Sequence, residues 1–178
     1  MKILRKWDVL THMKNKTNER KKMETENYTG YNLIHADSGI TFKWIDEKIL
    51  IIGGEGRCEL GSLQGHLRVK DSAKVIVQSV KGHAWGFDKS RLTVQTVGGD
   101  VESRDNGTIT AKTVLGNAVS CQDSTLTAET VGGYARSFDK GSLIAGIIKG
   151  TVECQDNSTI TAGIIEGLPT YRPYGGLV

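Results

Sequence analysis

The segment VGGDVESRDNGTITAKT at residues 97–113 runs directly into VLGNAVSCQDSTLTAET at 114–130, and the two place the same kinds of residue at the same positions. The agreement extends to 17-residue blocks that begin at residues 63, 80, 131 and 148, with a partial block from 165. Six complete blocks therefore cover residues 63–164 without an insertion or deletion. A fixed short period is typical of solenoids, in which each repeat buries its apolar side only against its neighbours.

The hydrophobic pattern inside each block predicts β-strands. Positions 1, 5, 13 and 15 are aliphatic in every block, and apolar and polar residues alternate around them, as in RLTVQ at 91–95. This period of two is typical of strands with one face on a core. Ala and Val at positions 5 and 15 predict an interior too narrow for a ligand, so function is expected on the outer faces or the ends. The fold class is therefore predicted to be all-β: a single-stranded β-solenoid, or parallel β-helix, of about six coils stacked about 4.8 Å apart.

Two polar or small columns predict the corners of the coil. Position 3 is glycine in every block, which indicates either a positive φ or the absence of room for a side chain. These structural glycines are Gly65, Gly82, Gly99, Gly116, Gly133, Gly150 and Gly167. Position 9 is Asp in five blocks, followed closely by Ser, Gly or Asn, which predicts a turn held by side-chain bonds to the backbone. In the fourth block Gln122 takes this place before Asp123, so the turn is expected to be shifted there by one residue.

The flanks of the repeat region are predicted to differ from it. Residues 1–30 are interpreted as a basic arm, since residues 1–26 carry eight Lys/Arg against four Asp/Glu. Within the arm, residues 2–14 can form a short helix with one apolar side, either a surface that docks on a membrane or a partner, or simply a cap. Residues 31–62 are predicted to be N-terminal cap strands outside the 17-residue columns, with Phe42 and Trp44 closing the stack. Residues 168–178 are predicted to be a C-terminal cap or tail, because Pro169 and Pro173 should not continue a ladder.

Charge, hydropathy and the cysteines indicate which partners and which cellular compartment to expect. The repeats and caps are nearly neutral, which argues against a nucleic-acid partner. No stretch is long and apolar enough for a membrane span or a signal peptide, so a cytoplasmic or virion-associated protein is expected. Cys58, Cys121 and Cys154 have no metal-binding spacing and are expected to be buried free thiols in a reducing compartment.

Each candidate site also has a structural interpretation that involves no ligand. His66, His83 and Asp100 occupy position 4 of successive blocks and are the weak candidates for a metal site, or else simply solvated corner residues. The Asp column could bind calcium or only hold its own turns. The pairs Thr108/Thr110, Thr125/Thr127 and Thr159/Thr161 resemble the threonine ladders of ice-binding solenoids, although Lys74/Ile76, Arg91/Thr93 and Ser142/Ile144 interrupt them. No cofactor is expected.

The run D-x-S-x-[LVI]-T-A followed by V-x-G-x-[AV] resembles the tandem repeats of phage and bacterial β-solenoid proteins. It is also loosely similar to bactofilins, and this resemblance implies a polymer-forming scaffold.

The function expected from the sequence is a non-catalytic structural or interaction module, a rigid rod that displays a face to a protein partner, a glycan or another copy of itself. Its outward isoleucines Ile76 and Ile144, with Ile147 and Ile164 at coil ends, favour self-association. The enzymatic alternative is a glycan lyase or hydrolase that uses Asp100 with Glu102, or Glu153 with Asp156.

Overall fold

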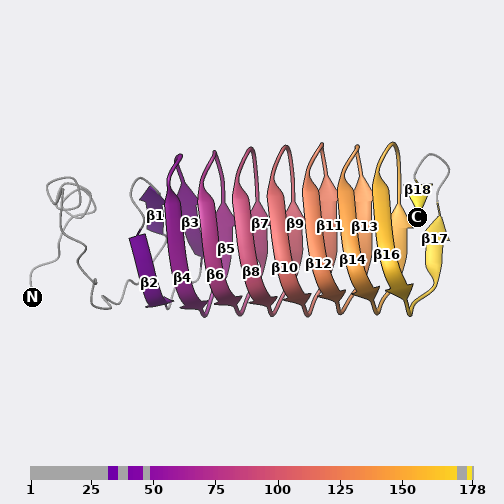
Figure 1. Cartoon of the computed structure of the whole chain (residues 1–178), viewed down its shortest axis with the longest axis horizontal. Helices are drawn as coiled ribbons and strands as arrows, with labels where there is room; N and C mark the ends of the chain where they lie inside the picture. Colours follow the sequence, from indigo (N-terminus) through magenta and orange to yellow (C-terminus); the bar gives the residue numbers. More distant parts are fainter. Residues whose placement is uncertain (1–31, 36–39, 46–48, 172–175, 178) are drawn as a thin grey trace, which may run out of the picture.

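The computed structural model describes residues 32–35, 40–45, 49–171 and 176–177, which form a straight stack of β-coils with two parallel nine-stranded sheets (Figure 1). The short sheet contains, in spatial order, β1 (Asn32–His35), β3 (Ile49–Gly53), β5 (His66–Val69), β7 (Ala84–Gly86), β9 (Val101–Ser103), β11 (Ala118–Cys121), β13 (Ala135–Phe138), β15 (Val152–Cys154) and β17 (Pro169–Tyr171). The long sheet contains β2 (Ile40–Ile45), β4 (Arg57–Leu63), β6 (Lys74–Val80), β8 (Arg91–Val97), β10 (Thr108–Val114), β12 (Thr125–Val131), β14 (Ser142–Ile148), β16 (Thr159–Ile165) and β18 (Gly176–Leu177). This described part of the chain contains no helix.

The strand register confirms the all-β parallel solenoid and its 17-residue period. Ile109 pairs with Leu126, and Ala118 pairs with Ala135, so equivalent positions of successive coils lie side by side in both sheets. Each coil contributes one strand to each sheet, and seven coils from β3/β4 to β15/β16 keep this spacing within the described residues. The described solenoid therefore has seven coils in this register, one more than the six blocks of the sequence predicted.

The extra coil corrects the prediction that residues 31–62 fall outside the 17-residue columns. Ile49 pairs with His66 and Cys58 pairs with Val75, which are the repeat register. This coil lacks glycine at position 3, so the block alignment missed it, yet Leu50, Cys58 and Leu60 fill its inward columns. Strands β1 and β2 stack on it with an offset of 18, as the pairing of Asn32 with Leu50 shows. The side chains of Phe42 and Trp44, and all of residues 1–31, lie outside what the structure describes.

The prediction that Pro169 cannot continue a ladder is also wrong. Pro169 pairs with Val152 in the usual register. At this position of earlier coils the N–H donates to the following coil, as from Ala135 to the carbonyl of Thr151. Because β17 is the outermost strand of the short sheet, the missing N–H of proline costs no ladder bond there. Pro173 lies outside the described residues.

Left-handed backbone defines the turn at position 9. Asp71, Asp88, Asp105, Asp139 and Asp156 have φ between 50° and 61°. Gln122 has φ 56° at the same position, so the turn of its coil is not shifted as predicted; Asp123 is simply the next turn residue. In the coil that the alignment missed, the position belongs to Gly54, with φ 96°.

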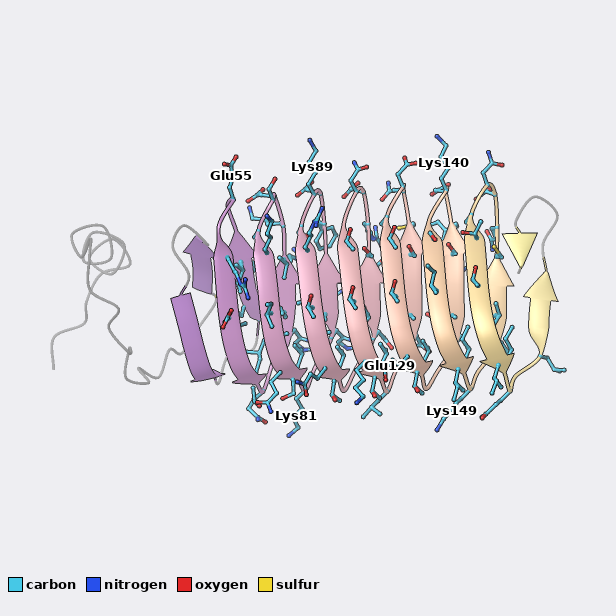
Figure 2. All side chains as sticks on the ribbon, viewed as in Figure 1. Glu55, Lys81, Lys89, Glu129, Lys140 and Lys149 are labelled. Atoms are coloured by element: carbon cyan, nitrogen blue, oxygen red, sulfur yellow. The ribbon has the colours of Figure 1, made fainter. Side chains whose placement is uncertain are left out.

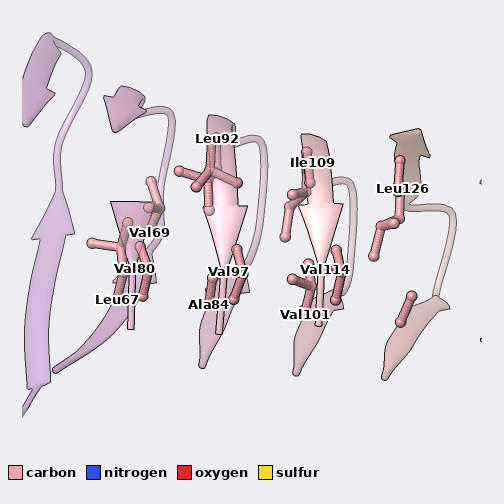
Figure 3. Close-up of a cluster of buried hydrophobic side chains, with 14 of the residues drawn as sticks. Leu67, Val69, Val80, Ala84, Leu92, Val97, Val101, Ile109, Val114 and Leu126 are labelled. Carbon is pink, nitrogen blue, oxygen red and sulfur yellow. The ribbon is translucent and has the colours of Figure 1, made fainter. Parts of the chain in front are cut away.

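The core consists of stacked columns of identical or similar aliphatic side chains. Leu92, Ile109 and Leu126 occupy one column in successive coils and are at most 1% exposed (Figure 3). Burying a side chain of this size contributes about 1.5–3 kcal/mol. Because each inward residue contacts its equivalents above and below, the stack holds every coil at the same height and orientation, which fixes the outer faces.

A buried serine network that the aliphatic pattern did not predict lies beneath the turn corner. Ser124 and Ser158 donate to the carbonyls of Ser103 and Ser137 in the preceding coils, both at 2.7 Å. In the intervening coils glycine replaces this serine. A second serine, at position 7, donates within its own coil in both kinds of coil, as from Ser103 to the carbonyl of Gly107 at 2.9 Å and from Ser120 to that of Ser124 at 3.1 Å. Serine and glycine thus alternate from coil to coil, and the alternation satisfies polar groups that are cut off from water.

Candidate interaction surfaces

The glycine corner is a site of close backbone approach between coils. Among the glycines of the described residues only Gly54 has a positive φ, so position 3 does not require one. A Cβ built on Gly116 would lie 2.7 Å from the carbonyl carbon and oxygen of Gly99 and 2.5 Å from Oδ1 of Asp100. The N–H of Gly99 meanwhile donates to the carbonyl of Gly82 at 2.9 Å. Of the two reasons predicted for glycine here, the lack of room is the correct one.

The polar column at position 4 is a hydrogen-bond ladder next to that corner. Nδ1 of His66 accepts the backbone N–H of His83 at 2.9 Å, and Nδ1 of His83 accepts that of Asp100 at 2.8 Å. Asp100 and Asn117 continue the ladder, since each accepts through Oδ1 from the following coil, at 2.8 and 3.0 Å. Each side chain thus accepts a backbone N–H that the next coil directs back toward it.

These bonds decide whether the three weak metal candidates have ligand atoms available for an ion. The structure places His66, His83 and Asp100 on successive coils, as predicted, with the two imidazole rings stacked at 4.9 Å and nearly parallel. The Nδ1 atoms must be unprotonated to accept, so they are not free to bind an ion. Burial, together with the neighbouring His83, lowers the pKa of His66. Within the part of the chain that the structure describes, no group of three or more metal-ligating side chains is present.

Carboxylates of the Asp column also bond between coils. Oδ2 of Asp71 accepts the N–H of Gly54 at 3.0 Å, and Oδ2 of Asp88 accepts the N–H of Asp71 at 3.1 Å. Bonding to backbone donors stabilises stacked carboxylates without a cation. These two bonds join neighbouring coils, so these two carboxylates bond the preceding turn, whereas the sequence predicted bonds within their own turn.

Three of the four acidic residues suggested for a glycan-acting enzyme bond to other groups in the structure. The guanidinium of Arg104 contacts Glu102, and Nε of Arg136 lies 3.0 Å from Oε2 of Glu153. Asp100 belongs to the hydrogen-bond ladder, and Asp156 lies in the left-handed turn.

An aromatic and basic cluster covers the outer face of the short sheet at β5 and β7. The guanidinium carbon of Arg68 lies 5.8 Å from the ring centre of Trp85 and 5.2 Å from that of Phe87. The centres of the two stacked histidine rings each lie 5.7 Å from that of Trp85. The 17-residue pattern does not distinguish these outward positions, and only the cross-coil register, in which Arg68 pairs with Trp85, brings them together.

The outer face of the long sheet carries a groove of about 1050 Å³ that crosses six strands from β4 to β14. Its floor is the backbone at position 15, where residues such as Ala111 and Ala128 point inward and leave space above. One wall is the column at position 14, which is β-branched from β6 to β14; in it Ile76 is 40% and Ile144 is 43% exposed. These exposures confirm that both isoleucines point outward, as predicted. Figure 2 shows Lys81 and Lys149 at one edge of this face and Lys89 and Lys140 at the other, so these lysines frame the face.

The three cysteines are free and buried, as predicted. Burial raises the pKa of Cys58 to about 12 and that of Cys121 to about 11, so both remain protonated at neutral pH. Cys58 and Cys121 are therefore packing groups with little thiolate character.

Comparisons with known proteins give no family for the chain: no family model, curated protein or solved structure matches it significantly. Among the described residues no helix is long and apolar enough to cross a membrane. The predicted docking helix at residues 2–14 lies outside them.

Proposed function

We propose that this protein is a non-catalytic interaction module whose binding surface is the outer face of the long sheet. The observation that carries the proposal is the groove across β4–β14, which is built from positions that repeat every 17 residues. A stacked core fixes these positions, so the surface can bind a partner without first ordering itself, which lowers the entropic cost of association.

The chemistry of the groove favours a partner with a flat, partly apolar surface. Its walls are threonine, isoleucine and glutamine, and exposed isoleucines gain free energy when a partner covers them. Its only charged side chains are Glu59, Lys112 and Glu129. A second solenoid or an extended chain lying across the strands fits this shape.

Two measurements test the proposal. The first is a turnover screen on glycans, esters and phosphates, for which no activity is expected; turnover that disappears when one surface residue is replaced would contradict a non-catalytic role. The second places a photo-crosslinking residue at Thr110 in the groove or at Val119 on the short sheet, in cells that make the protein. Crosslinks to a defined species should form from position 110 and not from 119, and the reverse pattern would move the binding surface.

A polymer-forming version follows from the resemblance to bactofilins. In it, coils at the ends of the rod stack on other copies and continue the sheets. Electron microscopy should then show filaments as wide as one rod. If no filaments form at high protein concentration, the protein is not a polymer-forming scaffold.

Ice binding is a second candidate, favoured by one observation. Thr93, Thr110 and Thr127 lie side by side in one outward column of β8, β10 and β12. Thermal hysteresis of the wild type that is lost in Thr110→Lys, but kept in Val119→Lys, would support it. No hysteresis at millimolar protein would exclude it.

A further inference from the structure

The column at position 16 of the long sheet changes character halfway along the rod. It contains Gln78, Gln95 and Lys112 in β6, β8 and β10, and then Glu129, Gly146 and Gly163 in β12, β14 and β16. All six residues are exposed, and five of them line the groove. The first half of the column therefore projects long side chains, whereas its last two positions offer only backbone, and the two opposite charges stand at the centre.

From this pattern we infer that the groove binds a second copy of the same chain, with the two rods antiparallel and face to face. The inference rests on the proposed function and names its partner. In this arrangement a two-fold axis lies between the two long sheets, parallel to the strands, and passes between β10 and β12. The axis reverses the order of the coils and keeps each position of the coil opposite the same position.

Such an axis makes the position 16 column complementary to itself. Lys112 faces Glu129 of the second copy, Gln95 faces its Gly146, and Gln78 faces its Gly163. Each long side chain thus faces either a residue of the other charge or a glycine that leaves room for it. Centring the axis on β10 would instead oppose Lys112 to itself, and centring it on β12 would oppose Glu129 to itself.

The neighbouring columns agree with the same axis. At position 14, Ile76 faces Thr161 of the second copy, and Thr93 faces its Ile144, so both exposed isoleucines of this column are covered by a β-branched side chain. At position 12, the cations Lys74 and Arg91 face Thr159 and Ser142 of the second copy. No two like charges meet across these three columns.

The charge of the whole rod favours antiparallel rather than parallel pairing. Residues 63–96 carry six Lys/Arg and two Asp/Glu, a net +4, whereas residues 97–166 carry five and nine, a net −4. With the axis between β10 and β12, residues 63–96 of each copy lie beside residues 131–164 of the other, which carry three Lys/Arg and three Asp/Glu, so antiparallel pairing keeps the two positive segments apart. Residues 97–130, a net −3, face themselves in either arrangement. Parallel rods would align segments of like charge.

The area of the face is sufficient for a specific dimer. Six strands of seven residues present a surface about 23 Å by 29 Å, or roughly 650 Å² before its corrugation is counted. Standard interfaces bury about 800 Å² per partner, so the face falls near that size.

Charge reversal tests the register on the full chain by analytical ultracentrifugation. Wild type should form a dimer, and Lys112→Glu or Glu129→Lys should raise its dissociation constant about tenfold, because each creates two repulsive pairs per dimer. The double variant K112E/E129K should recover wild-type affinity. Lys149→Glu, at the edge of the rod, is the matched control and should leave the constant unchanged. A double variant weaker than either single, or an equal effect of Lys149→Glu, would overturn the register.

Disulfide formation provides an independent readout, since the native thiols are buried. Chains carrying Thr93→Cys and Ile144→Cys should crosslink when mixed under oxidation, while neither should crosslink with itself. Self-crosslinking of Thr93→Cys would indicate parallel rods and contradict the inference. A wild type that stays monomeric at millimolar concentration would overturn the dimer but leave the proposed function standing, because the crosslinks from position 110 would then identify a different partner.

Discussion

The Nδ1 atom of His83 accepts a 2.8 Å hydrogen bond from the backbone N–H of Asp100, its equivalent residue one coil further along the rod. His66 makes the same bond to His83, and the Oδ1 atoms of Asp100 and Asn117 replace imidazole in the next two coils. A protonated Nδ1 is a donor and cannot accept an N–H. The ladder therefore requires neutral histidines, and this requirement makes stability depend on pH.

We expect the protein to lose stability as the pH falls below about 6.5, the pKa of an unperturbed histidine. The folded-state pKa of His66 is lowered, by burial first and by His83 second, so the unfolded chain binds the proton more readily. This contribution is complete above the unfolded pKa and is lost as the pH falls through the folded one. Asp100, with Oδ2 3.4 Å from Nδ1 of His83, is the acidic group that faces the pair.

Urea unfolding at pH 7.5 and pH 5 measures this effect. The double variant H66N/H83N is the matched control, because Asn117 shows that an asparagine side chain makes the same bond in this column. The control should lose less stability between the two pH values than the wild type does. Equal losses would assign the pH dependence to other groups.

The corner glycines should resist substitution because of contacts between coils. Gly116→Ala places a Cβ within 2.7 Å of two backbone atoms of Gly99, so we expect a loss of about 1–3 kcal/mol in the free energy of unfolding. Gly163→Gln should cost much less, because its Cβ has one close neighbour, the carbonyl oxygen of Gly146 at 2.8 Å, and Gln78 and Gln95 occupy equivalent positions. Thermal melts in dilute solution compare the two, and a greater loss for Gly163→Gln would contradict the structure of this corner.

Removing the hydroxyl of Ser124 should destabilise the turn side of the core. This Oγ lies 2.7 Å from the carbonyl of Ser103 and 3.1 Å from the N–H of Cys121. Ser124→Ala leaves buried polar groups without that partner, which costs about 1–3 kcal/mol. Ser72→Ala, in a half-buried turn, should stay within about 0.5 kcal/mol of wild type. Chemical denaturation of both variants decides whether the serine network is structural.

The cysteines should react with a thiol reagent only after unfolding. Cys58 and Cys121 are buried, and their raised pKa values of about 12 and about 11 leave little thiolate at pH 8. Reaction with an aromatic disulfide reagent should therefore be slow in buffer and rapid in denaturant. Rapid labelling of the native protein would show that one of the coils opens readily.

The sequence by itself determined the period of the coil and the direction of its side chains. Inward and outward positions alternate locally, so Leu92 and Ile76 could be assigned to core and surface from a few neighbouring residues. The same reasoning failed where the consensus glycine was absent, at 49–62, and where a rule for interior strands was applied to Pro169 at a sheet edge.

Tertiary structure alone decided what lies between coils. Three features depend on residues about 17 positions away and on the distance between stacked backbones. These are the reason that Gly116 must be glycine, the N–H that His66 accepts, and the contact between Arg68 and Phe87. The groove and the graded column at position 16 are likewise properties of adjacent strands. Periodicity identifies which residues occupy equivalent positions in successive coils. The space, hydrogen-bond donors and charges around each residue are decided by how the coils stack, because its hydrogen bonds and packing contacts are made with residues about 17 positions away rather than with its neighbours in the chain.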